Sequence, residues 1–335
     1  MDAQPDDAPL VDPNRLAAWL GGPVDVERHQ AGHSNETFFV RYHGAEYVLR
    51  RPPRGAFLPT AHDVLRGHRV LAALAPTGVR APKPYCACED ESVIGAPFYL
   101  MERVPGFVVR DRFPRELAPH AQRMGDELID ALAELHNLEW RGTALEQLGK
   151  ADGYLARQVK RWTGQMDMTL PWTEEKRPVP ELREVGAWLA ANAPESPRTT
   201  VVHGDYKPDN VVFAPDGSLR AILDWEMSTL GDPLADLGWL LSFWKNESSI
   251  QRDVTLAPGF ADREALIARY EKATGTPARN LAYYEALAVW KLAILLEGSY
   301  ARHLLGATDD PFFAKMETGV PELARRAWGI TRRAS

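Results

Sequence analysis

Three oxygen-bearing side chains lie in one short segment at spacings that could support phosphate chemistry: Asp205, Asn210 and Asp224. Asn210 follows Asp205 by five residues, and Asp224 follows it by nineteen. Phosphoryl transfer from ATP needs Mg²⁺ to neutralise the phosphates, and Mg²⁺ prefers carboxylate and other hard oxygen ligands. It also needs a group that orients the acceptor hydroxyl and takes its proton. The trio could supply these functions; the alternative is a polar turn with two solvated carboxylates, which the combined pattern disfavours.

The elements around this trio are predicted to be a loop and a hairpin. The strands 210–213 and 219–224 are separated by Pro215-Asp-Gly-Ser218, a strong turn signal. The loop holds Asp205 and Asn210, and the hairpin returns Asp224 beside them.

The first hundred residues are predicted to be mostly strand. Strands at 37–42 and 45–50 flank His43-Gly44, which is typical of a hairpin turn. A helix is expected from 62 to about 75, then a proline-rich loop up to Pro84, then a strand at 98–103.

Helical periodicity dominates the rest of the chain. Helices are expected from 124 to about 140, at 181–191 and over most of the chain after 235. A strand-rich part followed by a helix-rich part predicts an α+β protein with two domains rather than an alternating βαβ sheet. We place the boundary between 1–103 and 104–335, with about 1–13 as a flexible tail.

Composition narrows the possible partners and the compartment. The 335 residues carry a formal net charge of −7, which argues against a basic nucleic-acid-binding face. The apolar stretch 281–296 is interrupted by Glu285 and Lys291, so a buried helix is expected there rather than a membrane span. The two cysteines, Cys86 and Cys88, are too few for a zinc site, and no signal peptide is recognisable. We therefore expect a cytoplasmic protein that binds neither nucleic acid nor membrane; the oligomeric state stays open.

The motifs together resemble the protein-kinase-like superfamily, and most closely the aminoglycoside phosphotransferase and choline kinase family. Within it they resemble the subgroup that includes kinase-like domains fused to some acyl-CoA dehydrogenases. The resemblance extends from about residue 28 to 305. It implies a protein-kinase-like two-lobe fold, with a small β-rich nucleotide-binding N-lobe and a larger, mostly helical C-lobe. The segments that carry it are H-G-D-x-x-x-x-N at 203–210, D-W-E at 224–226, Gly231–Asp236, Gly32–Asn35, Tyr47–Pro53 and Pro97–Glu102.

By this resemblance, the chain is a small-molecule kinase that uses ATP as co-substrate and Mg²⁺ as cofactor. Asp205 would be the catalytic base, and Asn210 and Asp224 would bind Mg²⁺. Lys207 would lie near the transferred phosphate, although a surface lysine is the alternative.

The resemblance also assigns the ATP contacts. Ser34 and Asn35 would touch phosphate oxygens, and Arg50 would replace the strand lysine that holds the α- and β-phosphates. Arg51, the next residue along the strand, should point to the opposite face. Main-chain groups of Met101, Glu102 and Val104 would hold the adenine.

One departure from the family pattern concerns the helical glutamate that usually pairs with the basic strand residue. Gly67 occupies its place. Our hypothesis is that Asp63, four residues earlier on the same helical face, or a water molecule replaces it. The departure keeps open a second function, that of a nucleotide-binding pseudokinase acting as a scaffold.

Other polar residues of the motifs are interpreted as structural. His136 and His203 are expected to pack rather than to catalyse. Asp232 and Asp236 are expected to cap a helix and steady the catalytic loop.

The acceptor is expected to be a small hydroxylated molecule. Gly204 cannot pair with a phosphorylated loop, and 225–231 is too short for the activation loop of a protein kinase. An aminoglycoside would be met by carboxylates, for which Glu297, Asp309 and Asp310 are available. A hydroxyacyl-CoA would need basic groups, for which Arg157, Lys160, Arg161 and Arg302 are available.

Overall fold

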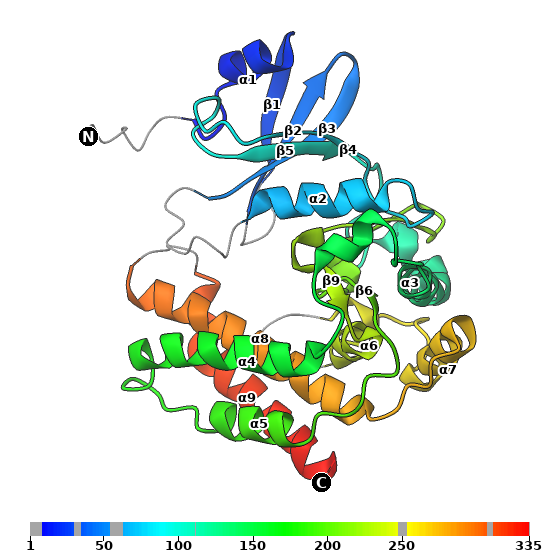
Figure 1. The fold of residues 1–335 in the computed structure, drawn as a ribbon, viewed down its shortest axis with the longest axis vertical. Helices are drawn as coiled ribbons and strands as arrows, with labels where there is room; N and C mark the ends of the chain where they lie inside the picture. Colours follow the sequence, from blue (N-terminus) through cyan, green and yellow to red (C-terminus); the bar gives the residue numbers. More distant parts are fainter. Residues whose placement is uncertain are drawn as a thin grey trace. The chain divides into compact units, whose positions relative to one another are not determined.

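The computed structural model describes residues 9–29, 35–53, 63–110, 112–246, 253–306 and 311–334 (Figure 1). The chain is an α+β protein that divides into two compact units. The first comprises Met1–Gly106 and Arg220–Glu226, and the second comprises Phe107–Leu219 and Met227–Ser335. The segment 220–226 thus groups with the first unit, although it lies more than a hundred residues further along the chain.

The first unit contains a five-stranded antiparallel sheet in the order β1-β2-β3-β5-β4. His43 and Gly44 both adopt positive φ between β2 and β3, as a tight hairpin turn requires. The predicted strands at 37–42, 45–50 and 98–103 are confirmed. The strands are β1 (Val24–His29), β2 (Glu36–Tyr42), β3 (Ala45–Arg51), β4 (Pro84–Cys88) and β5 (Phe98–Glu102).

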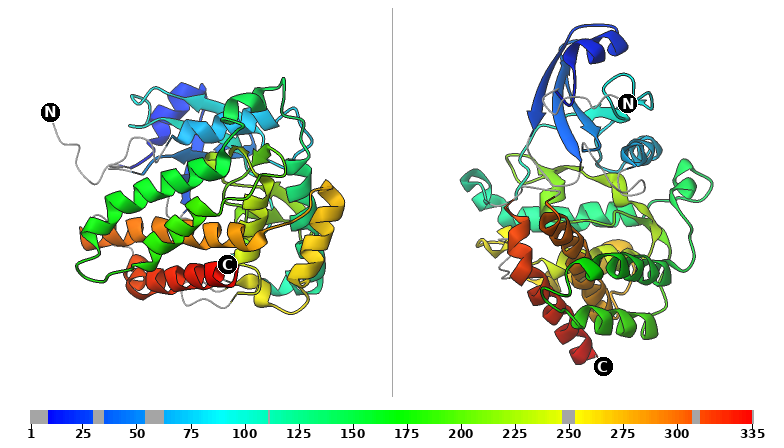
Figure 2. Two further views of the ribbon diagram at one scale, coloured as in Figure 1. Left: turned by 60° about the horizontal axis from the view of Figure 1, so that its bottom comes forward. Right: turned by 90° about the vertical axis from the view of Figure 1, so that its left-hand side faces the viewer.

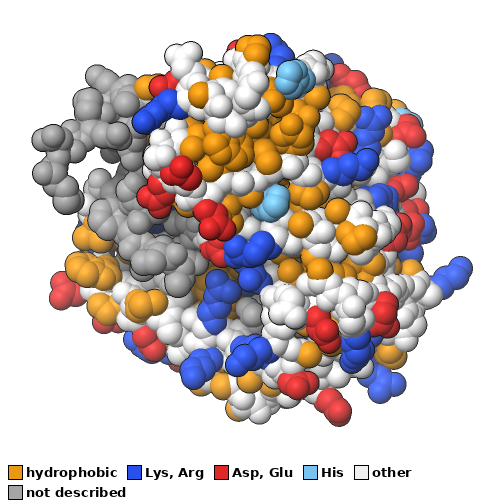
Figure 3. Space-filling view, turned by 45° about the horizontal axis from the view of Figure 1, so that its top comes forward, with side chains coloured by type: hydrophobic (Ala, Val, Ile, Leu, Met, Phe, Trp, Pro, Cys, Tyr) orange, Lys and Arg blue, Asp and Glu red, His pale blue; other side chains and the backbone are white. Residues whose placement is uncertain are grey.

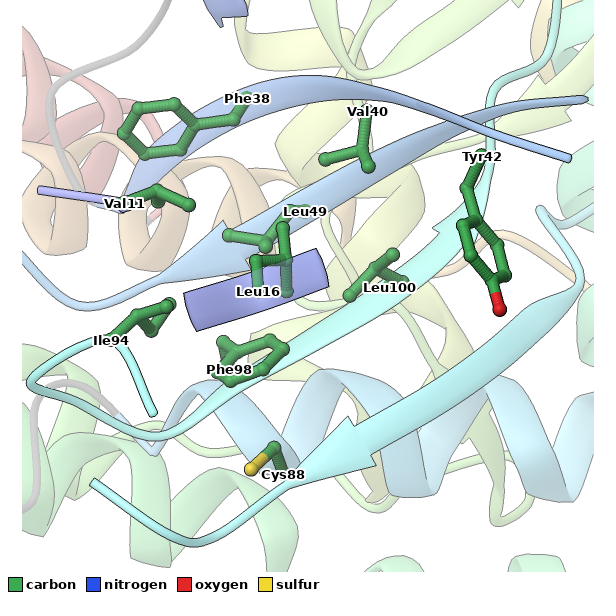
Figure 4. Close-up of a cluster of buried hydrophobic side chains, with 10 residues drawn as sticks. All are labelled: Val11, Leu16, Phe38, Val40, Tyr42, Leu49, Cys88, Ile94, Phe98 and Leu100. Carbon is green, nitrogen blue, oxygen red and sulfur yellow. The ribbon is translucent and has the colours of Figure 1, made fainter. Parts of the chain in front are cut away.

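One face of this sheet is buried in an apolar cluster that includes Leu16 of helix α1 (Pro13–Leu20). Figure 4 shows Leu16 close to Leu49 of β3 and Phe98 of β5. On the opposite face, helix α2 (Val64–Leu74) packs against β4 and β5, so that Gly67 lies beside the Tyr99 ring. Because side chains alternate along β5, Phe98 and Leu100 belong to the apolar cluster on one face and Tyr99 lies against α2 on the other.

The structure differs from the predictions in the N-terminal region and at Pro84. Helix α1 and strand β1 were not predicted, and Pro84 starts a strand where a loop was expected. Because β4 is an edge strand, Pro84 costs the sheet no ladder hydrogen bond. Helix α1 is held at its start by Asp12, whose carboxylate accepts a bond from the Asn14 amide.

The second unit is mostly helical and is organised around helix α8 (Leu281–Leu304), which packs against α4, α5, α6 and α9 (Figure 2). Its first two-thirds are buried almost all round, as the apolar stretch predicted. The helix predicted at 181–191 is confirmed, and that predicted at 124–140 starts and ends three or four residues earlier. The other helices are α3 (Ala121–His136), α4 (Tyr154–Thr169), α5 (Glu181–Ala191), α6 (Pro233–Ser242), α7 (Arg263–Thr274) and α9 (Met316–Ala334).

Among the described residues, four short strands lie between α5 and α6 in the sequence, and the last three residues of β8 belong to the first unit. Strand β6 (Thr200–Val202) pairs antiparallel with β9 (Thr229–Gly231). Strand β7 (Val211–Phe213) is followed by the predicted turn, where the Ala214 amide donates to the Ser218 carbonyl over 2.8 Å, and then by β8 (Leu219–Ile222).

The surface is of mixed charge. Acidic and basic side chains are interspersed on the face drawn in Figure 3. Exposed ion pairs such as Arg183 with Asp167, 2.7 Å apart, contribute little to stability because water screens them. Among the helices that the structure describes, none is both long and apolar enough to cross a membrane.

The contact between α6 and α8 depends on Gly238. A Cβ atom placed there would come within 2.5 Å of the Tyr284 Cβ. We predict that Gly238→Ala lowers the free energy of unfolding by about 1–3 kcal/mol through overpacking. The matched control is Gly164→Ala in α4, where a Cβ meets nothing within 4 Å, and which should raise stability by about 0.5–1 kcal/mol. Chemical denaturation checks both, and equal effects of the two variants would contradict the packing argument.

Candidate functional site

The loop between β6 and β7 brings Asp205 and Asn210 together. The Asn210 side-chain amide donates to the Asp205 carboxylate over 2.8 Å and to its carbonyl over 2.9 Å. A single 3-10 turn, Pro208–Asn210, makes this possible because it folds the chain back after Lys207. Since the Asn210 nitrogen is fixed by Asp205, its amide oxygen faces the other way, as a ligand for a hard cation would have to.

Lys207 lies at the same place. Its Nζ atom is 3.5 Å from Asp205 Oδ2 and 3.4 Å from Asp209 Oδ2. The side chains of Lys207, Asp205 and Asp209 are each partly exposed, so the lysine ammonium group lies at the surface of the loop and is not buried. This position suits a cation that meets a phosphate approaching Asp205.

The loop itself is held by a buried carboxylate, that of Asp236. It accepts the His203 amide over 2.6 Å and the Gly204 amide over 2.8 Å. His136 Nε2 lies 3.3 Å from the same carboxylate. Burial acts to raise the pKa of Asp236, but the hydrogen bonds that it accepts, first from His136, outweigh burial and lower the pKa. Asp236 therefore stays ionised and fixes the two peptides that precede Asp205.

The neighbouring polar residues are structural, as predicted. Asp232 caps α6 by accepting the Leu234 amide over 2.9 Å, and it also accepts the Tyr284 hydroxyl over 2.7 Å. His203 is fully buried, and its Nδ1 atom accepts the Asp205 amide over 3.2 Å.

In the first unit, Arg50 forms ion pairs with two carboxylates, those of Glu226 and Asp224. Its Nη2 atom is 2.9 Å from Glu226 Oε1 and 3.3 Å from Asp224 Oδ1. The Asn35 side-chain amide also donates to Glu226, over 2.6 Å. Burial acts to lower the pKa of Arg50, but Asp224 and then Glu226 outweigh it and raise the pKa, so the guanidinium keeps its charge. Arg51 points to the other face, as predicted, and donates to the carbonyl oxygens of Leu10 and Ile94.

The same cluster leaves two polar atoms without a partner. Within the described part of the chain, Arg50 Nε and Asn35 Oδ1 are buried and accept or donate no hydrogen bond. Buried polar atoms are normally satisfied, so this cluster has an unused donor that a bound anion could take. Asp224 also adopts a left-handed backbone, with φ 65°, which is uncommon for a residue other than glycine and typical of functional sites.

The hypothesis that Asp63 pairs with Arg50 is wrong. Asp63 instead caps α2 by accepting the Arg66 amide over 3.0 Å, and it forms an ion pair with Arg69. Sterics explain why position 67 is glycine, since a Cβ atom there would lie 2.9 Å from the Tyr99 hydroxyl oxygen. The tyrosine thus fills the space of the missing glutamate.

Glu226 is the functional residue that sequence reasoning missed. It is the last residue of the D-W-E motif at 224–226, in which the resemblance assigns a role only to Asp224. Its position two residues after Asp224 was the available signal, because the two carboxylates flank one buried tryptophan, Trp225.

The predicted adenine-binding segment lies at the end of β5. Met101 is buried and pairs with Val48, and the Glu102 amide donates to the Lys83 carbonyl over 2.8 Å. Val104 lies two residues after Glu102, the last residue of β5. Ser34, predicted to touch phosphate, lies outside the described residues.

Of the three acidic residues considered for an aminoglycoside, Glu297 lies in the described part of the chain. Glu297 is buried, with its carboxylate 2.6 Å from Arg177 and 2.5 Å from the Thr173 hydroxyl. It is a structural ion pair, and the expectation that it faces an acceptor is wrong. Asp309 and Asp310 lie outside the described residues.

In the described ranges, no group of three or more His, Cys, Asp or Glu side chains could hold a metal ion by itself. The predicted ligands are instead one amide and one carboxylate, Asn210 of the second unit and Asp224 of the first. Mg²⁺ is commonly held by one or two protein oxygens together with phosphates and water, and Asn210 and Asp224 stay predicted ligands.

We predict that Arg50 is energetically coupled to Glu226 and not to Asp63. In a double-mutant cycle, Arg50→Met and Glu226→Gln should show a coupling free energy of about 0.5–3 kcal/mol, because the two groups share a hydrogen bond. The matched cycle with Asp63→Asn should be additive within about 0.3–0.5 kcal/mol. Both are measured by chemical denaturation, and coupling to Asp63 instead would contradict the assignment.

Comparison with known proteins gives a consistent family. The model of the phosphotransferase enzyme family matches residues 25–288. The acyl-CoA dehydrogenase family member 11 of Gallus gallus is 36% identical over 328 residues, which are 94% of this chain and 41% of that protein. The chain thus spans about two-fifths of the length of such curated relatives. The homoserine kinase of Caulobacter sp. (strain K31) is 26% identical over 77% of both chains.

Solved structures show the same fold. A crystal structure of a candidate aminoglycoside phosphotransferase from Ralstonia eutropha JMP134 has a TM-score of 0.80 and 31% identity. The match covers 96% of this chain and 98% of the other. The predicted fold and the resemblance to the dehydrogenase-linked subgroup are both confirmed.

Proposed function

Because the chain belongs to the phosphotransferase enzyme family, we propose that it transfers the γ-phosphate of ATP to a hydroxyl group of a small molecule, with Mg²⁺. The observation that carries this proposal is the hydrogen bond between Asn210 and Asp205, on a loop fixed by Asp236. This arrangement holds the Asp205 carboxylate where it can accept a proton, and it orients the Asn210 amide oxygen for a cation.

In this proposal, each residue has a separate task. Asp205 orients the acceptor hydroxyl and takes its proton, and Lys207 meets the transferred phosphate. Asn210 and Asp224 hold Mg²⁺, which neutralises phosphate charge when it is bound. This division needs no phosphorylation of the chain itself.

The nucleotide would be held by the first unit. Arg50, kept charged by Glu226 and Asp224, has the unused Nε donor for a phosphate oxygen. Asn35 and Ser34 would lie on the same phosphates, and the main chain of Met101, Glu102 and Val104 would hold the adenine.

The pseudokinase alternative loses its main support. It rested on Gly67 in place of a glutamate, and Arg50 has a carboxylate partner in Glu226 instead. The Tyr99 side chain explains why glycine is needed at position 67. A basic residue that has a carboxylate partner from another segment supports the enzyme.

We predict different effects for the two aspartates. Asp205→Asn should lower kcat by about 10²–10⁴-fold, the range for a general base, with little change in the affinity for Mg-ATP. Asp224→Ala should weaken Mg-ATP binding itself because a metal ligand is lost. Coupled-enzyme kinetics and isothermal titration calorimetry measure the two effects. The reverse pattern would contradict the assigned roles.

For the acceptor, we propose a hydroxyacyl-CoA or a similar hydroxylated metabolite in preference to an aminoglycoside. The relatives joined to acyl-CoA dehydrogenases support this class. The pairing of Glu297 with Arg177 removes one of the three carboxylates considered for a polycation. Helix α4 offers Lys160 and Arg161, both exposed, for the CoA phosphates.

We also propose that the protein lies in the cytoplasm, where the free thiols of Cys86 and Cys88 would stay reduced.

This acceptor class predicts a charge effect on α4. With a hydroxyacyl-CoA ester, Lys160→Ala combined with Arg161→Ala should raise KM about threefold to tenfold, as the loss of about 1 kcal/mol of charged contacts implies. The control is Arg183→Ala on α5, which breaks an exposed ion pair with Asp167 and should leave KM unchanged. Faster turnover of kanamycin than of every CoA ester would overturn the acceptor class.

A further inference from the structure

Helix α8 contains a buried lysine that the proposed chemistry does not use. Lys291 is 8% exposed and lies in the apolar part of the helix. Its Nζ atom donates to the carbonyl oxygen of Gly204 over 2.5 Å. Burying an ammonium group is costly, so its retention beside the loop suggests a role beyond packing.

Aromatic rings hold this ammonium group in place. Nζ lies 4.2 Å from the centre of the Trp239 ring and 5.6 Å from that of Trp162. Such rings attract cations through their negative faces. A cavity of about 20 Å³, room for one water molecule, lies beside the lysine and is also lined by Tyr154 and Tyr284.

The hydrogen bond from Lys291 completes a clamp on one residue. The Gly204 amide donates to Asp236, and the Gly204 carbonyl accepts from Lys291. Gly204 has φ 85°, and a Cβ atom there would lie 2.8 Å from the Met227 carbonyl oxygen. No other residue type fits this place, so the chain is fixed immediately before Asp205.

The clamped carbonyl belongs to the peptide bond that joins Gly204 to Asp205. The orientation of that peptide plane sets the direction in which the Asp205 side chain leaves the backbone. Without the hydrogen bond from Lys291, the Gly204–Asp205 peptide plane could rotate. The Asp205 carboxylate would then move away from the hydroxyl group that accepts the phosphate.

We propose that Lys291 is a positioning residue for phosphoryl transfer, which fixes the Gly204–Asp205 peptide and thereby aims the Asp205 carboxylate. The inference rests on the proposed function, because it assigns Lys291 a part in the same site. The role is indirect: Lys291 acts through the loop and does not touch the acceptor.

The charges around Lys291 make its protonation testable. Burial lowers the pKa of Lys291 to about 8, while Asp205 and Asp236 oppose this and Arg161 and Lys207 add to it. The two tyrosines beside the cavity, Tyr154 on α4 and Tyr284 on α8, have pKa values raised by burial and stay neutral. The ammonium form is therefore present below about pH 8 and is lost as the pH rises through that value.

The kinetic test compares Lys291→Met, which removes the charge and shortens the unbranched side chain by one atom, with Lys291→Arg. Lys291→Met should lower kcat by up to about 10²-fold, the cost of a misplaced catalytic group, with the KM for ATP unchanged. Lys291→Arg should restore part of kcat and move the alkaline loss of activity above pH 8. The control is Val289→Ala, a buried position of the same helix that should change stability and not kcat. A Lys291→Met variant as active as Val289→Ala would overturn the proposal.

A second measurement does not depend on turnover. In hydrogen exchange, the amides of His203 and Gly204 should exchange faster in Lys291→Met than in Val289→Ala, because one half of the clamp is gone. Unchanged exchange would overturn the positioning role. A wild-type protein without turnover would instead contradict the proposed function, so the two failures are distinguishable.

Discussion

The candidate site of the second unit depends on the hydrogen bonds that the buried carboxylate of Asp236 accepts. This carboxylate accepts hydrogen bonds from the backbone N–H groups of His203 and Gly204, the two residues that precede Asp205. Because a buried charge without partners is costly, Asp236, His136 and the two amides must be placed together. The loop geometry is thus a condition of folding, and the Asn210–Asp205 bond follows from it. Lys291 adds a second constraint from α8 on the next peptide, the one that joins Gly204 to Asp205.

In the first unit, the corresponding constraint is that the buried guanidinium of Arg50 needs carboxylate partners. Arg50 finds its carboxylates in Asp224 and Glu226, whereas the helix that would ordinarily provide one has glycine at position 67. Tyr99 fills the space that this glycine leaves. The basic group is therefore retained with another partner, and an exchange of this kind is compatible with an active nucleotide site.

Local signals in the sequence predicted much of the fold. The His43-Gly44 turn fixed the β2–β3 hairpin, and apolar periodicity located α5 and α8. The same signals were misleading at Pro84, because its tolerance depends on β4 being an edge strand, which only the sheet order decides. The spacing of Asp205 and Asn210 was sufficient to predict that they meet. The contacts of Glu226 and Lys291 were not predictable, since they join residues 176 and 87 positions apart. Glu297 was misread because an acid in a buried ion pair looks the same in sequence as an exposed one.

Transfer of phosphate from ATP to an alcohol can be tested by following the acceptor. Purified protein is incubated with Mg-ATP and a panel of hydroxylated metabolites, hydroxyacyl-CoA esters and aminoglycosides. Mass spectrometry then identifies every compound that has gained a phosphate. We expect one phosphorylated acceptor, which is formed in equal amount with ADP and is absent when Mg²⁺ is chelated. Tight binding of Mg-ATP with no acceptor modified and no ADP formed would contradict it.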